Sequence, residues 1–369
     1  MRFTLSIFLS IQLVFFSCVE NFSFESDDEE QALVVEGFIT DISYNDAIFL
    51  PMDARNFEIR LKMSSPVINV QDQPVLYAEV KLYDDLGNCW DYTDLSTNLR
   101  PGVYALMNDD FSVQQDRMYQ LQIVLGDGRQ YESGFESVPA AIPAGEIITQ
   151  QTVRPQLLED ETTIANVDGL SLRYKLDPSA RAPEESHYVW DFTTTYGYLA
   201  LSNQDNSSPV RKCWMTTVYD HSQITLVDNV QEELDYELLF FDVGHQWLPE
   251  GISLLISQYS VSKDFYQFYD DIQAQEQQSE LFAPPPFNTS SNLYPVGHNS
   301  PVIGFFQVAN QNVYRWIFSP EMLDFAIPYP EWMRAGCDAL PPPECFDCTL
   351  ATPPPRGYLV RDKPEWWID

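Results

Sequence analysis

Short segments in which apolar and polar residues alternate fill the first third of this chain, and they leave few folds open to it. Every second residue of 57–63 is apolar and the residues between are charged, and 76–83 and 119–125 repeat the pattern. Such alternation places an apolar row on one face of a β-sheet and a polar row on the other. Asp127-Gly128 then supplies a residue pair typical of a two-residue hairpin turn.

With 33–39 and 103–107 added, about six or seven short strands fill residues 32–138. We therefore predict a mainly β protein whose N-terminal domain, 32–138, is an immunoglobulin-like or transthyretin-like β-sandwich. Residues 139–145 contain two prolines and one glycine. Because such residues do not continue a central strand, we expect 139–145 to be a linker.

The remainder, 146–369, is predicted to be a larger β-rich domain with one amphipathic helix at 262–281. Phe265, Phe268, Tyr269 and Ile272 recur at the spacing of one helix face. Prolines are frequent beyond residue 319, so we expect the C-terminal tail to wrap the domain in extended segments that make few sheet hydrogen bonds. Proline outnumbers glycine, 26 to 15, which suits short strands joined by turns.

The charge of the chain limits its partners. Acidic side chains outnumber basic ones, 55 to 20, and give a formal net charge of −35 at pH 7. A protein of this charge repels phosphate backbones and anionic lipid headgroups at long range. We therefore exclude nucleic acid as a partner.

The N-terminus has the organisation of a lipoprotein signal peptide, which we assign to residues 1–17. A basic residue is followed by an uncharged, mostly apolar run over 3–16, and a serine precedes Cys18. This run is shorter than the ~20 residues that cross a bilayer. We predict that Cys18 becomes the lipidated first residue of the mature chain and that the acidic segment 18–31 is a flexible tether. The alternative is an ordinary signal peptide with an incidental cysteine.

Four cysteines in the second half of the chain are predicted to form structural disulfides: Cys213, Cys337, Cys345 and Cys348. An exported protein meets oxidising conditions, under which disulfides are the default state of cysteine. A metal site and a redox-active Cys345–Cys348 pair are the alternatives, although prolines rather than a helix N-terminus precede that pair. We expect the disulfides to pin the proline-rich tail to the body, with Cys213 as one anchor. The pairing and the state of Cys89 stay open.

The sequence contains no assembled catalytic or cofactor-binding motif, so we expect a non-enzymatic protein without cofactor or metal. The four histidines are scattered, and phosphate-loop, Gly-x-Ser-x-Gly and Gly-x-Gly-x-x-Gly patterns are absent. Acidic pairs such as Asp84-Asp85 lie at turn signals, where carboxylates usually cap the turn; calcium binding is the alternative. Among many aromatic residues, Trp247, Tyr266 and Tyr269 are candidate contacts for a ligand or partner, the alternative being that they pack in the core.

Several segments occur in an informative order along the chain: 33–41, 102–104, 119–131, the predicted helix with the following 282–286, 301–306, Cys345-x-x-Cys348 and 363–367. In this order they resemble the domain of unknown function 4249 family of Bacteroidota outer-membrane lipoproteins, over nearly the whole mature chain. The resemblance implies a lipid-anchored, surface-exposed protein of the outer membrane, frequently encoded beside TonB-dependent receptors. It supplies no catalytic residues to carry over.

These observations favour a binding or accessory lipoprotein, anchored at Cys18, that works with a TonB-dependent receptor in nutrient capture. A surface hydrolase that uses paired carboxylates is a second hypothesis, because an acidic chain of this kind contains many possible pairs. A structural or adhesive surface protein is a third. The sequence does not identify a ligand.

Overall fold

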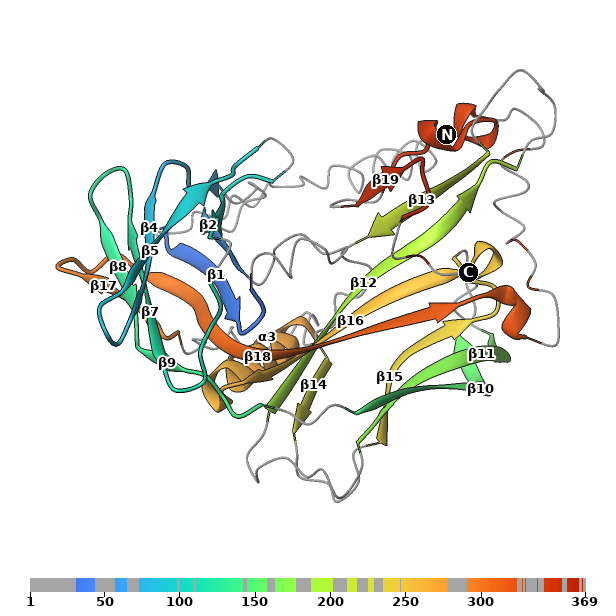
Figure 1. Cartoon of the computed structure of the whole chain (residues 1–369), viewed down its shortest axis with the longest axis horizontal. Helices are drawn as coiled ribbons and strands as arrows, with labels where there is room; N and C mark the ends of the chain where they lie inside the picture. The colour runs from blue at the N-terminus through green and yellow to red at the C-terminus, as the bar shows by residue number, and fades with distance from the viewer. Residues whose placement is uncertain are drawn as a thin grey trace, which may run out of the picture.

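The computed structural model is mainly β, as the sequence predicts (Figure 1). Residues 1–30, which include Cys18 and nearly all of the predicted tether, lie outside the described residues. The structure describes 31–43, 57–64, 73–97, 100–108, 111–141, 145–157, 163–176, 187–201, 211–217, 225–228, 235–245, 247–277, 291–323, 327, 329, 337, 342–353, 357–364 and 367.

The first region is a β-sandwich whose two layers share one core (Figure 1, left). β5 pairs with β4 in one layer and with β6 in the other, so it joins the layers. Buried residues alternate with partly exposed ones along β4 and β7, which confirms the predicted faces. Its N-terminal strands are β1 (Leu33–Thr40), β2 (Glu58–Met63), β3 (Gln73–Pro74), β4 (Glu79–Asp84), β5 (Cys89–Asp94), β6 (Val103–Leu106), β7 (Met118–Val124), β8 (Gln130–Ser133) and β9 (Glu136–Ser137).

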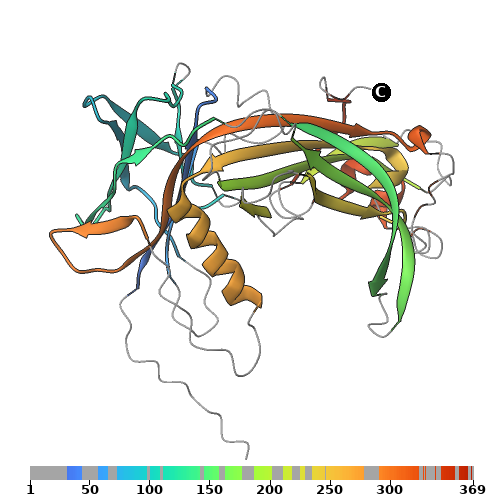
Figure 2. The ribbon, with the colours of Figure 1, turned by 90° about the horizontal axis from the view of Figure 1, so that it is seen from below.

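Two strands from the far end of the chain complete this sandwich. β17 (Leu293–Val296) pairs with β8, and the first half of β18 (Val302–Phe318) lies parallel to β1, from Val302 beside Leu33 to Ala309 beside Thr40. The second half of β18 pairs with β16 (Ile252–Val261) in the second region. Figure 2 shows this long strand running from one region into the other. The chain therefore does not divide into two regions at 139–145 alone, because the later segment 293–309 returns to the first sandwich.

The second region also has two layers. One runs from β18 through β16, β12 and β13 to β19, and the other is a sheet of three strands in the order β10-β11-β15. Tyr174, Trp190 and Ile256 are among the side chains from both layers that fill its core. Its elements are β10 (Glu146–Leu157), β11 (Ile164–Lys175), β12 (His187–Leu199), β13 (Lys212–Thr217), β14 (Thr225–Asp228), β15 (Asp235–Asp242), β19 (Tyr358–Val360) and the short 3-10 helices η4 (Leu248–Glu250), η5 (Pro320–Met322), η6 (Pro343–Cys345) and η7 (Cys348–Leu350).

Helix α3 (Lys263–Gln277) covers the junction of the two regions. It begins one residue after the predicted start at 262, because Ser262 caps it by accepting a hydrogen bond from the Phe265 N–H (3.2 Å). The predicted apolar stripe is confirmed, because Phe265 and Phe268 are buried against Phe305 of β18. The predicted residues 278–281 lie outside the described residues. Among the helices that the structure describes, none combines the length and apolar character that crossing a membrane requires.

Two disulfides hold the C-terminal tail. Cys213 of β13 is bonded to Cys348, and Cys337 is bonded to Cys345. The prediction of structural disulfides with Cys213 as one anchor is confirmed. Cys89 is an exposed free cysteine. The tail also contributes β19, which adds a short strand to β13, so the end of the chain is fixed both covalently and by backbone pairing.

Gly304 is a point at which the shared strand tolerates no side chain. Its φ is +117°, and a Cβ would lie 1.9 Å from the carbonyl oxygen of Val35 in β1. We expect Gly304→Ala to lower the free energy of unfolding by about 2 kcal/mol, through backbone strain and displacement of β1. Urea denaturation measures this loss. Gly128→Ala is the control, since φ there is +91° but nothing lies within 4 Å; an equal loss in both variants would contradict the steric argument.

Candidate functional site

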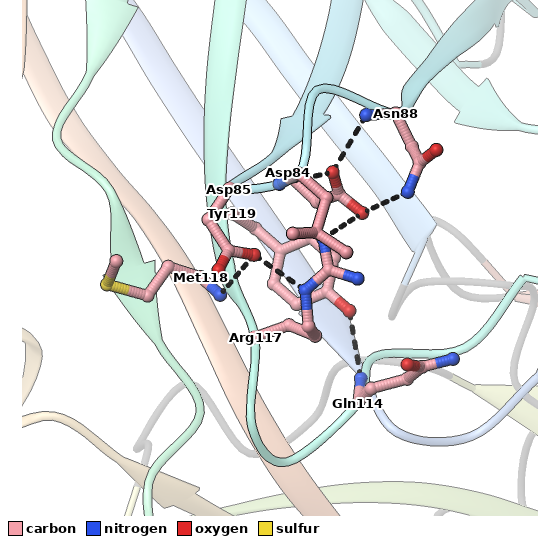
Figure 3. Close-up of polar contacts among 8 residues, drawn as sticks. Asp84, Asp85, Asn88, Gln114, Arg117, Met118 and Tyr119 are labelled. Carbon is pink, nitrogen blue, oxygen red and sulfur yellow. Dashed lines mark hydrogen bonds and ion pairs between the residues drawn. The ribbon is translucent and has the colours of Figure 1, made fainter.

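The predicted acidic turn at Asp84 is a closed hydrogen-bonding cluster (Figure 3). Asp84 ends β4 with its side chain buried. It accepts hydrogen bonds from the backbone N–H groups of Leu86 (3.0 Å) and Asn88 (2.8 Å) and from the Asn88 side-chain amide (2.7 Å). An Arg117 guanidinium nitrogen lies 2.5 Å from its second oxygen. The carboxylate thus caps its own turn as expected, and its donors occupy the oxygens that a calcium ion would need.

Arg117 joins this turn to the loop that precedes β7. Its Nε also donates to Asp85 (2.6 Å), and the neighbouring Tyr119 hydroxyl accepts from the Gln114 N–H (2.9 Å). Desolvation alone would raise the pKa of Asp84, but the Asn88 and Leu86 donors and Arg117 outweigh it and hold the pKa below its ordinary value. The hydrogen bond from Arg117 similarly lowers the pKa of Asp85. The polar atoms of this Asp84–Arg117 cluster are therefore bound to one another by hydrogen bonds and ion pairs, and the cluster is not an open binding site.

A metal centre does not emerge from the described part of the chain. There, no three side chains among histidine, cysteine, aspartate and glutamate converge as metal ligands. The predicted lipidation site, Cys18, lies outside this part.

The three aromatic contact candidates lie partly or wholly inside the protein. Trp247 is 2% exposed and stacks on Tyr196 with ring centroids 5.2 Å apart. That burial is a correction, because a ring enclosed by the second core does not present itself to a partner. Tyr266 packs beside the His187 imidazole (4.9 Å), and Tyr269 packs beside Phe265 (4.7 Å), both half-buried at the junction core.

An exposed apolar surface lies instead on the far halves of β10 and β11, which we call the arm (150–157 and 164–168). Figure 2 shows these two strands curving away from the sheet of β12, β16 and β18. Leu157 faces Ile164 across the pair, and Val153 and Pro155 share their face by alternation. Val153, Leu157 and Ile164 are 56%, 55% and 71% exposed. We call Val153, Pro155, Leu157 and Ile164 the arm face.

The opposite side of the arm makes charged and aromatic contacts with β15, the third strand of the same sheet. The Arg154 guanidinium lies over the Phe240 ring, 3.3 Å from its centroid, and donates to Glu237 (2.7 Å). Ser171 donates to the other oxygen of Glu237 (2.5 Å). At the base of the arm, the Gly145 N–H donates to the Tyr314 hydroxyl (3.1 Å). By alternation, the arm face lies on the same side of this sheet as Leu170, Leu172 and Tyr174 and continues it beyond the second core, where its side chains are exposed.

Sequence reasoning did not find the arm. Its β10 strand carries apolar residues at Val153 and Leu157, but polar residues on both faces of 149–152 interrupt the alternation. Pro155 further weakens a strand prediction, since proline is confined to edge strands. β10 is such an edge strand. The placement of Val153, Pro155 and Leu157 at every second position was the sequence signal that could have predicted an apolar strand face here.

These features define a mainly β protein of two sandwich regions that share one strand and carry an arm with an exposed apolar face. A family model described as "Domain of unknown function (DUF4249)" matches residues 19–315, so the chain belongs to this family, as the resemblance indicated. No curated protein matches it significantly. Among solved structures, a candidate carbohydrate-binding protein from Bacteroides uniformis is 12% identical; the match covers 64% of this chain and 92% of that one, with a TM-score of 0.14. A likeness that low carries no argument about fold or function.

Proposed function

We propose that this protein is a binding or accessory lipoprotein, anchored at Cys18 in the outer membrane and exposed at the cell surface. It works there with a TonB-dependent receptor in nutrient capture. The arm face is the surface that contacts the receptor. The lipoprotein signal in the sequence supports the location, and the geometry of the arm supports the contact.

The exposed arm face is the observation that carries this proposal. Soluble proteins rarely leave large apolar side chains grouped on one open face unless a partner covers them. A second copy of the chain is a poor occupant, because two bodies with a formal charge of −35 each repel one another. A different protein with an apolar contact surface and basic surroundings fits the arm better.

The double change Leu157→Ser and Ile164→Ser is expected to weaken receptor capture about tenfold, since it removes apolar area that the complex would bury. The measurement is affinity capture through a tag on the chain from detergent-solubilised outer membranes, with the receptor quantified by mass spectrometry. Both residues are exposed, so the midpoint of thermal unfolding should stay unchanged.

Leu86→Ser with Met118→Ser is the matched control, because these exposed apolar residues lie at an end of the first sandwich, away from the arm. That control should capture the receptor as well as the unaltered chain does. Isolation of the chain without any receptor would contradict the proposed function. Undiminished capture by the arm variant would contradict only the role of the arm.

A further inference from the structure

The backbone is strained at Tyr77, and the ring of this residue lies in solvent. Tyr77 has a φ of 59°, in the left-handed region that a bulky residue avoids, and is 85% exposed. A residue other than glycine in that region costs about 1–2 kcal/mol. The ring contributes little packing in return, so interactions other than core packing must hold the backbone in this conformation.

Hydrogen bonds on both sides of Tyr77 hold this turn (75–78) in place. The Tyr77 N–H donates to Asp94 (2.9 Å), the Ala78 N–H donates to the Tyr104 hydroxyl (2.9 Å), and that hydroxyl donates to the Val75 carbonyl (3.1 Å). Desolvation would raise the pKa of Asp94, but the donors of Ser96 and Tyr77 outweigh it and keep the pKa below its ordinary value. The turn is thus rigid and presents its ring at a fixed position.

The turn lies at the end of the first sandwich where the chain enters the fold. The Val75 N–H donates to the carbonyl of Leu61 in β2 (3.0 Å). Ser64, which follows β2, exchanges two hydrogen bonds with Ala32 (2.9 and 2.8 Å). Ala32 directly follows Gln31, the first described residue. Tyr77 and the entry of the chain therefore share one end of the sandwich.

The same end carries further apolar surface. Leu76 precedes Tyr77 and Leu95 follows Asp94, and both side chains are exposed. Gln31 follows Cys18 by 13 positions, a length of chain that spans at most about 45 Å. A lipid on Cys18 would keep this end of the sandwich close to the bilayer surface.

We infer that Tyr77, together with Leu76 and Leu95, docks this end of the sandwich on the headgroup layer of the membrane that holds the anchor, an inference that rests on the proposed function. Tyrosine suits that layer because its ring is apolar and its hydroxyl is polar. The contact need not be strong, since the anchor makes it intramolecular and raises its effective concentration. It rests on apolar and aromatic groups, so added salt should leave it intact.

The test places a nitroxide label at Leu76→Cys in a Cys89→Ser background, which removes the exposed free cysteine. The acylated full-length chain is reconstituted in vesicles of phosphatidylethanolamine and phosphatidylcholine. Collisions of the label with a water-soluble nickel chelate should fall several-fold on reconstitution. A label at Leu86→Cys is the matched control, because Leu86 is exposed at the opposite end of β4, and its collision rate should stay unchanged.

Tyr77→Gly in the same labelled background separates docking from folding. Glycine relieves the left-handed strain, so the thermal midpoint should hold or rise while the label at position 76 returns to full exposure. A label at position 76 that stays as exposed as the one at 86, in chains that vesicles retain through Cys18, would overturn the docking and leave the proposed function standing. Protection that arises only when a receptor is added would also overturn it. If vesicles retained a Cys18→Ala chain equally well, Cys18 would not be the anchor, and the inferred docking would be contradicted as well.

Discussion

Replacing both cysteines of the long-range disulfide, Cys213→Ala with Cys348→Ala, should lower the free energy of unfolding by about 5 kcal/mol. The two residues are 135 positions apart, so their bond removes a large loop-closure entropy from the unfolded chain. Both are buried, with Ala200 beside them. Guanidinium denaturation followed by fluorescence measures the loss. Amide exchange in β19 should also accelerate, because that strand would lose its covalent support.

The second disulfide provides the matched control. Cys337 and Cys345 are eight positions apart, and a loop of that size gives a stabilisation of about 2.5 kcal/mol. Cys337→Ala with Cys345→Ala should therefore cost about half as much and leave amide exchange in β19 little changed. Equal losses from the two double variants would show that loop length does not govern the stability of the tail.

Local sequence patterns identified most strands of the first sandwich because alternation reports which residues face inward. Alternation does not indicate which other strand of the chain a given strand pairs with. β1 pairs with β18, some 270 positions away along the chain, and nothing within 33–40 indicates that partner. The run at 302–309 is nearly continuous in apolar residues, and from Gly304 onward it is buried on both faces, as expected for a strand in a parallel pair. The sequence marked this run as a motif, but its role in joining the two regions came only from the structure.

The candidate site was harder to predict than the fold. The cysteine spacing allowed several pairings, and only three-dimensional proximity chose between them. Trp247 was misplaced because aromatic residues occur both in cores and at interfaces, and the sequence alone does not decide the place of a single one. Tyr77 was counted as one position in an alternating strand, yet β4 begins only at Glu79. A left-handed residue leaves no mark on the polarity pattern, since the pattern records side-chain polarity and not backbone conformation.

Removing the guanidinium from the Asp84–Arg117 cluster by Arg117→Met should lower the free energy of unfolding by about 3 kcal/mol at pH 7. The change keeps an unbranched apolar side chain but leaves the buried Asp84 carboxylate without its cation. Urea denaturation between pH 3 and pH 7 is the measurement. Because the folded state lowers the pKa values of Asp84 and Asp85, their contribution is complete above about pH 4, the ordinary carboxyl value, and declines as the pH falls through the lowered values. The gap between variant and unaltered chain should therefore narrow below about pH 4.

Two further variants separate an unpaired buried charge from lost packing. Arg129→Met breaks the exposed pair with Asp127 and should cost at most about 1 kcal/mol, since solvent screens such pairs. Adding Asp84→Asn to Arg117→Met should recover a large part of the loss, because a neutral amide needs no cation and still accepts hydrogen bonds from Leu86 and Asn88. A double variant as unstable as Arg117→Met alone, at every pH, would mean that the arginine stem packs the turn and that its charge is incidental.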